Sequence, residues 1–458
     1  MTSIPDNVTR DLCKRITGIT FDDLNDGAIA AARQLFLDGV AVAFAGSQLE
    51  EPPVLLAEQA KEYGGAEQAS VIGLGFKTSI NQAALINGAA MHVLDYEAMW
   101  MPVNHQLSTC LPAILALAEH KRLPGREIAA AFVKGIEMMG RIRQASKQFD
   151  TRIHFFHFPA ATGPMGSAVA AAHLLGLDAD TLCHAFGIAA SRAAGVWDNA
   201  GTHTKSTHCG LACANGLESA LLASRGFTGN PKIFETPRGY VGAFFDINDF
   251  DWDHLLSYGE PLKVLDPGYA IKMYPSQYAT HFIIDATLGT RAKVNDPEHI
   301  EELTLHAPPI NYVDRPAPDS GLAGKFSFQY VAAAAWLDGD ITMDSFTDER
   351  RFAPDMERML DKVRYNKRDD ISAVLGERYV EVEAKMKDGT SEITRSDGPP
   401  GCFGQDPIPP EKHLDKVRAC LALKLTDAEI ERVIEMGSRL ETLSGEDIQE
   451  LMSILSAA

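Results

Sequence analysis

Residues 154–218 alternate long runs of small residues with short islands of polar, ionisable ones, and this pattern constrains the fold more than any other stretch. The runs 163–172, 187–195 and 210–220 are mostly Ala, Gly and Ser at helical spacing, so the helices they form can approach closely. Imidazole and ammonium groups among tightly packed apolar helices are costly unless they have partners or a task. We therefore expect the active site among the polar islands, which hold His154, His157, Asp198, Thr202, His203, Thr204, Lys205 and His208.

The composition is that of a globular protein and narrows the range of partners. The chain has 458 residues, enough for two or three domains, and is 45% hydrophobic and 23% charged. Its formal net charge of −20 argues against binding to nucleic acid or to anionic membranes, because both need clustered Lys and Arg. If the substrate is an anion, its pocket must be locally basic against this overall charge.

The cysteines and the N-terminal segment indicate in which cellular compartment the protein is expected. The seven cysteines are odd in number and irregularly spaced, which favours reduced thiols and a cytoplasmic protein. The first 18 residues lack the apolar core of a signal peptide. No uninterrupted apolar run reaches roughly 18 residues, so we expect no membrane span.

Hydrophobic periodicity predicts a mainly α protein made of two parts. A large all-helical part is expected from residues 1–267 together with 403–458, and its tail, 411–457, should dock back on the first helices. A smaller α+β part is expected between them, at 268–402, with a strand near 298–308 and a hairpin over 378–396 that turns at Asp388–Gly389. The main helices are predicted at 7–18, 22–46, 51–64, 79–95, 108–120, 126–146, 163–176, 179–194, 205–226, 279–292, 325–337 and 354–363.

Two histidines have both a structural and a chemical interpretation. His105 precedes Ser108, which should cap the following helix, so His105 is either a partner of that cap or a general base. His157 is either a structural cap of the helix after it or an acid–base group. A metal site would need further ligands, and the nearby His203, His208, Cys209 and Cys213 match no zinc signature, so we predict no metal.

Lys205 opens an apolar helix, with Thr202 and Thr204 before it and His208 one turn on. A helix N-terminus attracts anions because its first amides are unpaired and its dipole is positive. An ammonium group there makes a carboxylate or phosphate pocket, although a solvated lysine at a helix start is the alternative. Lys272 and Tyr312 lie in the α+β part and could fold over the helical part.

Taken together, these segments resemble the MmgE/PrpD family, which includes dehydratases, decarboxylases and an epimerase. The resemblance extends over nearly the whole sequence, and its most specific segments are LDYEAMWMPVNH (94–105), HFPAATGPMGSAVAAAHLLGL (157–177), THTKSTHCGLACANGLESALLASRGFTGN (202–230), IKMYPSQYATH (271–281), NYVDRPAP (311–318) and FSFQYVAAAAWLDG (326–339). It implies a homodimer with a helical domain, an inserted α+β lid, an active site at their junction, and no metal or organic cofactor.

The motifs are most similar to those of the cis-aconitate decarboxylase branch of that family. By this resemblance, active-site positions are held by Asp95, His105, His157, Lys205, Lys272 and Tyr312. We predict that the catalytic residues are Asp95, His105, His157, Lys205 and Tyr312, and that the substrate-binding residues are Lys272, His208, Gln277 and Met99. Met99 stands where that branch has threonine, and Gln277 stands where it has histidine. Both changes adjoin the presumed carboxylate pocket, so they alter which carboxylate or hydroxyl group the pocket can hold.

Acid–base chemistry at carbon is the function these residues indicate. Moving a proton next to a carboxylate needs a base near neutral pKa, hence histidine, and cations that stabilise the developing charge, hence Lys205 and Lys272. No grouped cysteines suit an iron–sulfur cluster. We expect a cofactor-independent lyase, a dehydratase or decarboxylase, acting on a small di- or tricarboxylate, with Tyr312 as a proton donor and Asp95 orienting a histidine. The alternatives are an epimerase or isomerase of an amino- or imino-dicarboxylate, and a non-catalytic protein that binds a small anion.

Overall fold

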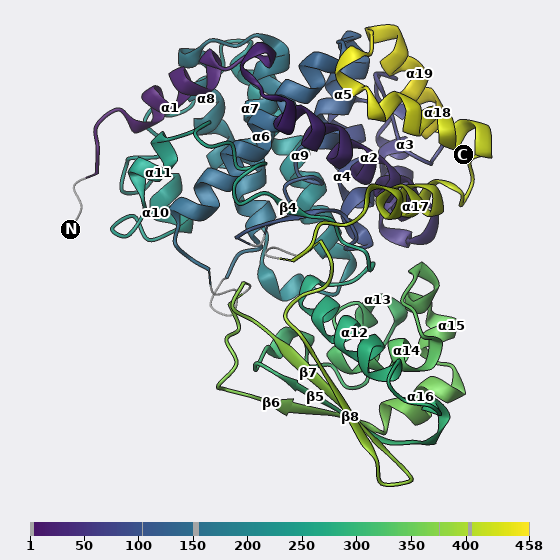
Figure 1. Cartoon of the computed structure of the whole chain (residues 1–458). Helices are drawn as coiled ribbons and strands as arrows, with labels where there is room; N and C mark the ends of the chain where they lie inside the picture. The colour runs from purple at the N-terminus through teal and green to yellow at the C-terminus, as the bar shows by residue number, and fades with distance from the viewer. Residues whose placement is uncertain (1–3, 103, 150–154, 375, 402–404, 458) are drawn as a thin grey trace.

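The computed structural model describes residues 4–102, 104–149, 155–374, 376–401 and 405–457, and it is mainly α-helical with small sheets, as predicted. Figure 1 shows a large helical part and a smaller part that contains the main sheet. The helices of the large part are α1 (Val8–Gly18), α2 (Asp26–Leu49), α3 (Glu51–Tyr63), α4 (Ile80–Val93), α5 (Leu111–Lys121), α6 (Gly125–Ala145), α7 (Phe158–Leu175), α8 (Ala179–Ala190), α9 (His203–Ala223), α10 (Tyr240–Phe244), α11 (Trp252–Leu256), α17 (Pro410–Leu421), α18 (Asp427–Ser438) and α19 (Gly445–Leu455).

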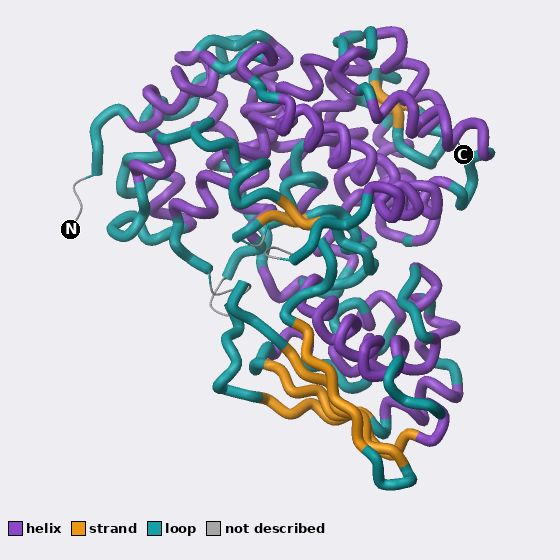
Figure 2. The backbone as a smooth tube through the Cα atoms, in the orientation of Figure 1, coloured by secondary structure: helices purple, strands orange, loops and turns teal. Residues whose placement is uncertain are grey.

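The smaller part combines a four-stranded sheet with helices (Figure 2). Strand order is β6-β5-β7-β8; β5 pairs with β6 in parallel, and the other two pairs are antiparallel. Its elements are α12 (Tyr278–Arg291), β5 (Ile300–Ala307), α13 (Gly321–Gly324), α14 (Phe328–Asp338), α15 (Asp348–Arg351), α16 (Pro354–Leu360), β6 (Val363–Lys367), β7 (Val380–Met386) and β8 (Ser391–Ser396). One hydrophobic core lies between the sheet and helices α12 and α14.

The predicted hairpin is confirmed, with Val380 opposite Ser396 and the turn at Asp388–Gly389. Every second residue of β7 is buried, which matches the alternation in the sequence. Strand β6 was not predicted, because its sequence, VRYNK, buries only Val363 and has no clear alternation. Its pairing with β5, a contact distant in sequence, decides its conformation.

Several helix starts differ from prediction, and those of α7 and α5 bear on the site. Helix α7 begins at Phe158 instead of 163, because proline is tolerated in the first turn of a helix and Pro159 stands there. Pro164, inside the helix, has no N–H for the carbonyl of Ala160, and that carbonyl accepts the N–H of Ala194 instead. Helix α5 begins at Leu111 after Cys110, so the prediction that Ser108 caps it is wrong.

The C-terminal tail packs back on the first helices, as predicted: α17 and α18 contact α2, and α19 contacts α5. Helix α2 is long and apolar enough to cross a membrane by length and composition, which the search for uninterrupted apolar runs missed. However, 78% of its most apolar window is buried inside the protein, as expected of a core helix. The domain boundaries near residues 267 and 403 remain a proposal.

Close helix packing by small residues brings two segments of the site together. At the crossing of α4 and α9, a Cβ atom on Gly210 would lie 2.2 Å from the carbonyl oxygen of Leu85, and one on Gly88 would lie 2.7 Å from the Cα of Gly210. Only glycine fits at such distances. Four residues after Gly88 and five before Gly210 come His92 and Lys205, whose side chains meet.

Candidate active site

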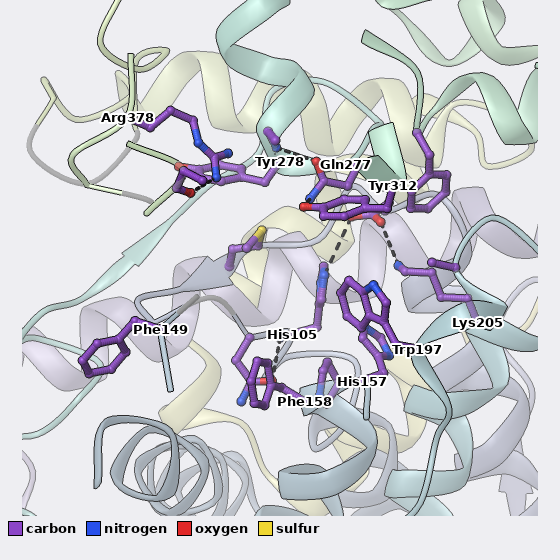
Figure 3. Close-up of a pocket in the computed structure, with 18 residues that line it drawn as sticks. His105, Phe149, His157, Phe158, Trp197, Lys205, Gln277, Tyr278, Tyr312 and Arg378 are labelled. Atoms are coloured by element: carbon purple, nitrogen blue, oxygen red, sulfur yellow. Dashed lines mark hydrogen bonds and ion pairs between the residues drawn. The ribbon is translucent and has the colours of Figure 1, made fainter. Parts of the chain in front are cut away.

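A cavity lies between the helical part and the α+β part (Figure 3). Its volume, measured as the space open to the centres of water molecules, is about 50 Å³. One water molecule needs ~10–15 Å³ on the same measure. The cavity therefore suits a small molecule. All the predicted site residues line it except Lys272 and His208; its lining is Asp95, Met99, Asn104, His105, Phe149, His157, Phe158, Pro159, Trp197, Ala200, Lys205, Gln277, Tyr278, Ala279, Tyr312, Phe326, Ala373 and Arg378.

Asp95 is the centre of a buried ion cluster. Its carboxylate accepts hydrogen bonds from Lys205 at 2.8 Å and from Lys272. Burial alone would raise the pKa of Asp95, but the two ammonium groups outweigh it and hold this pKa well below its usual value. The backbone of Asp95 is left-handed, with φ of 51°, a conformation that aspartate tolerates better than most residues.

The two lysines differ in what they can offer a substrate. Lys272 is fully buried, and its three N–H groups donate to the carboxylate of Asp95, the carbonyl of Asp95 at 2.7 Å and the carbonyl of Ser276 at 3.2 Å. Lys205 donates to Asp95 and to Nε2 of His92 at 2.7 Å, and these are its only hydrogen-bond partners among the described residues. One N–H of Lys205 is therefore available at the cavity, whereas Lys272 supports Asp95 from behind.

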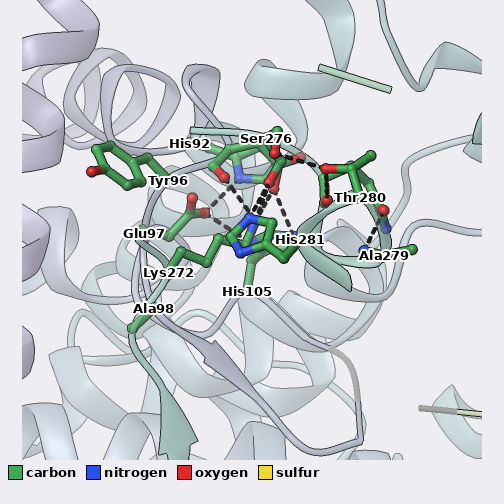
Figure 4. A network of polar contacts seen from close by, with 12 residues as sticks. His92, Tyr96, Glu97, Ala98, His105, Lys272, Ser276, Ala279, Thr280 and His281 are labelled. Atoms are coloured by element: carbon green, nitrogen blue, oxygen red, sulfur yellow. Dashed lines mark hydrogen bonds and ion pairs between the residues drawn. The ribbon is translucent and has the colours of Figure 1, made fainter. Parts of the chain in front are cut away.

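Glu97 and His92 complete the cluster, and neither was predicted from the sequence (Figure 4). Glu97 is fully buried and lies 2.6 Å from Nδ1 of His92, 3.0 Å from Nδ1 of His105 and 2.9 Å from the hydroxyl of Ser108. Burial would raise the pKa of Glu97, but the two imidazoles hold it well below its usual value. Glu97 thus occupies the position that orients histidines, a role expected of Asp95, which lies 3.9 Å from Nε2 of His105.

The contacts of His92 assign its tautomer, and the nearby charge of Glu97 bears on that of His105. Burial, together with the charge of Lys205, lowers the pKa of His92 to about 3, so this ring is neutral. Its Nε2 accepts from Lys205, so its proton is on Nδ1 and faces Glu97. Glu97 likewise favours a proton on Nδ1 of His105. The Nε2 atom of His105, on the side of Asp95 and the cavity, is then the atom that can exchange a proton with a ligand.

His157 stands immediately before α7, but its side chain makes no capping hydrogen bond, so the cap interpretation is not supported. Instead its Nδ1 lies 3.3 Å from Nδ1 of His208, and its ring packs against Trp197 at a centroid distance of 5.3 Å. Burial first, and then the charge of Lys205, lower the pKa of His157 well below its usual value and that of His208 to about 4. His208 thus supports His157 from behind the cavity wall.

The α+β part contributes Tyr312 and Gln277. The side-chain oxygen of Gln277 accepts from the N–H of Ala279 at the start of α12, and its amide nitrogen donates to the hydroxyl of Tyr312 at 3.0 Å. The hydroxyl oxygen of Tyr312 therefore accepts a hydrogen bond at the cavity wall. Met99, on β3 (Met99–Trp100), is buried and gives the cavity an apolar wall.

Some expected residues lie elsewhere. Asp198, Thr202, His203 and Thr204 are exposed, although they are neighbours of Lys205 in sequence, and His154 lies outside the described residues. Conversely, the structure adds Arg378 and Trp197 to the cavity wall. Arg378 lies just before β7, where charged residues alternate with apolar ones. Nothing in the sequence distinguishes it from a charged residue that faces solvent.

A buried lysine fixes the backbone behind the site. Lys416 of α17 donates to the carboxylate of Asp38 at 2.7 Å, the carbonyl of Tyr96 at 2.8 Å and the carbonyl of Lys272 at 2.9 Å. Asp38 also accepts the N–H of Ala98 at 2.9 Å. The pairing of β3 with β4 (Tyr269–Ala270) joins the same two segments. The C-terminal tail thus sets the distance between the segments that carry Asp95 and Lys272.

Among the residues that the structure describes, two groups of side chains have the geometry to hold a metal ion. The ligand atoms within each set, His92, His105 and His157, or Asp95, Glu97 and His105, lie within 4.8 Å of one another. However, Lys205 and Glu97 occupy both ring nitrogens of His92, and two ammonium groups occupy Asp95. Like charge would oppose a divalent cation here. The absence of a metal stays a prediction.

The buried histidines predict loss of stability in mild acid. Burial lowers the pKa of His92 and of His281 to about 3, against about 6.5 in an unfolded chain. Below pH 6.5 the unfolded chain binds more protons than the folded one, so stability is intact above that pH and is lost as the pH falls towards 3. We expect each histidine to cost about 1 kcal/mol at pH 5.5 relative to pH 7.5.

Urea unfolding at the two pH values measures this loss. Replacing His281 by glutamine, which does not titrate, should reduce the difference between them. An unfolding free energy that stays constant or rises between pH 7.5 and 5.5 would contradict the prediction.

A mainly helical fold with an α+β part, and a buried cavity in which imidazoles, ammonium groups and carboxylates converge, define a protein built for acid–base chemistry on a small molecule. Comparison with known families agrees: residues 10–253 match the MmgE/PrpD N-terminal domain, and residues 274–442 match the MmgE/PrpD C-terminal domain. The chain belongs to the MmgE/PrpD family. It is an enzyme, a lyase of the type found in that family.

Its relatives include cis-aconitate decarboxylases. The chain is 33% identical to the cis-aconitate decarboxylase of Mus musculus, over 98% of this chain and 93% of the relative. It is 30% identical to that of Homo sapiens and 26% identical to that of Aspergillus terreus, over 98% of this chain in both and over 94% and 96% of the relatives. The expected resemblance to this branch is confirmed.

Proposed function

We propose that this enzyme removes carbon dioxide, or water, from a small di- or tricarboxylate by proton transfer at a carbon atom next to a carboxylate, without a metal or organic cofactor. The observation that carries the proposal is that two groups face the same cavity: Lys205, which has an N–H available there, and Nε2 of His105. The relatives named cis-aconitate decarboxylases favour loss of carbon dioxide.

The roles follow from the contacts. Lys205 donates to a substrate carboxylate and stabilises the negative charge that develops on it, in a site where burial strengthens this interaction. For decarboxylation, the C–C bond to the leaving carboxylate breaks, its electron pair passes to carbon, and a proton from Tyr312, or from His105 when both its ring nitrogens are protonated, neutralises that carbon. For dehydration, a histidine takes the proton from carbon and Tyr312 protonates the leaving hydroxide.

The substrate itself depends on the wall formed by Met99 and Gln277. Met99 offers no hydrogen bond comparable to that of a hydroxyl, and the amide of Gln277 already caps α12 and donates to Tyr312. Neither residue can exchange a proton as an imidazole does. This wall therefore differs from the one expected in the decarboxylase branch, and cis-aconitate is one substrate to test among several. A cytoplasmic homodimer is proposed on the family resemblance alone.

Incubation with a panel of small polycarboxylates, including cis-aconitate, in deuterated water tests the proposal. We expect a product that has lost carbon dioxide or water and carries deuterium at one carbon, at the same rate after dialysis against EDTA. A product of unchanged mass apart from exchange would show an epimerase or isomerase. No turnover of any member, or turnover that EDTA abolishes, would contradict the proposed lyase or its independence from metal.

A further inference from the structure

The charges around the catalytic end of the cavity cancel. Asp95 and Glu97 carry two negative charges, and Lys205 and Lys272 carry two positive ones. A di- or tricarboxylate brings two or three negative charges into a protein whose net charge is already −20. Binding it needs a further cation inside the cavity, because an uncompensated charge in a buried site is costly.

Arg378 supplies such a cation. Apart from Lys205, it is the one lysine or arginine among the described residues that line the cavity. It is 7% exposed, and a guanidinium stays charged at any physiological pH. Its guanidinium lies near the ring of Phe282, and one N–H donates to the carbonyl of Ala373, so the side chain is held in place.

Arg378 and Lys205 belong to different parts of the molecule and lie on opposite sides of the cavity in Figure 3, with Tyr278, Gln277 and Tyr312 between them. Lys205 is on α9 of the helical part, and Arg378 precedes β7 of the α+β part. Helix α12, whose N-terminal residues line the same wall as Arg378, adds its positive dipole end. A ligand that touches both cations must carry two anionic groups that span the cavity.

We propose that Arg378 binds a second carboxylate of the substrate, remote from the one held by Lys205, and so selects a substrate with carboxylates at both ends over one that carries a single carboxylate. This inference rests on the proposed function and deepens it. The planar guanidinium can hold a carboxylate through two parallel hydrogen bonds, which adds orientation to affinity. The reacting carbon is thereby fixed relative to His105, because the substrate is held at both ends.

Calorimetric titration with two unreactive probes tests the assignment. Propane-1,2,3-tricarboxylate carries carboxylates at both ends, and butanoate carries one carboxylate only. We expect the wild-type enzyme to bind the tricarboxylate more tightly than butanoate. Arg378→Gln should weaken tricarboxylate binding by about tenfold or more, while butanoate binding changes less than about threefold; Arg378→Lys, which keeps the charge without the planar fork, should recover part of the loss.

Arg395→Gln is the matched control, since it removes the same charge from the same part of the chain at an exposed position paired with Asp397. It should leave both affinities unchanged. If Arg378→Gln weakens both probes equally, or neither, the assignment of Arg378 fails while the lyase proposal stands. If the wild-type enzyme neither binds these probes nor converts any polycarboxylate, the proposed function itself fails, and this inference fails with it.

Discussion

Replacing Lys205 by methionine should lower kcat/KM for the preferred polycarboxylate by about a thousandfold or more. The change removes the donor that faces the cavity, and loss of one such preorganised donor typically costs about a hundredfold to a thousandfold. It also removes the hydrogen bond to His92 and half of the compensation of Asp95. Both effects act on the same cluster, so the loss should exceed that of a single missing contact.

The pKa of Asp95 explains why this loss cannot be only a binding effect. Burial opposes ionisation of Asp95, and the two ammonium groups together keep it ionised. In Lys205→Met, only the ammonium group of Lys272 remains to offset the cost of burying the charged carboxylate of Asp95. The carboxylate then takes up a proton more readily, which changes the field at Nε2 of His105, 3.9 Å away. We therefore expect a fall in kcat as well as a rise in KM.

Steady-state kinetics of Lys205→Met beside Lys134→Met measure this effect. Lys134 is also a buried lysine, but it contacts the carbonyl of Ile19 and His173 and does not line the cavity. The control should lose stability yet keep kcat/KM within about threefold of wild type. A Lys205→Met enzyme that folds and retains more than a tenth of wild-type kcat/KM would refute the role proposed for this lysine.

The sequence was sufficient for the main helices, for the hairpin of β7 and β8 and for part of the site. His105 and Lys205, which the sequence singled out as candidate site residues, do line the cavity. Ionisable groups beside apolar helices rich in small residues are costly to bury, so they often mark a site. Distance along the chain misled elsewhere. His203 and Thr204 are exposed although they adjoin Lys205, since a helix turns successive side chains to different directions.

His92, Glu97 and Arg378 were missed for a physical reason. His92 lies in the last turn of a helix, and Glu97 lies in the polar loop that follows. From the sequence, each would be expected to face solvent. They become site residues only because the glycine contact between α4 and α9 brings His92 to Lys205. Arg378 precedes a strand whose charged residues alternate with buried ones, and its approach to the cavity depends on how the α+β part packs on the helical part. Such distant contacts leave no periodic signal.

Replacing Glu97 by glutamine should lower kcat by about a hundredfold or more, with a much smaller change in KM. Glutamine has nearly the same shape, but it removes the negative charge and one of the two acceptor oxygens. The amide can present a donor where Nδ1 of His92 and of His105 now place their protons, which would favour the wrong tautomers. Losing the carboxylate that orients a catalytic imidazole is costly even when geometry is preserved.

Glu119→Gln separates this effect from simple loss of a buried carboxylate. Glu119 is buried and accepts from the N–H and hydroxyl of Ser70 and from Lys77, but it does not line the cavity. Its replacement should lower stability and leave kcat within about threefold of wild type. If both glutamine variants reduce kcat equally, or if Glu97→Gln leaves kcat unchanged, Glu97 does not position the imidazoles. Because Glu97 contacts two histidines and does not line the cavity, a large effect on kcat alone would identify it as a positioning residue that acts through His92 and His105.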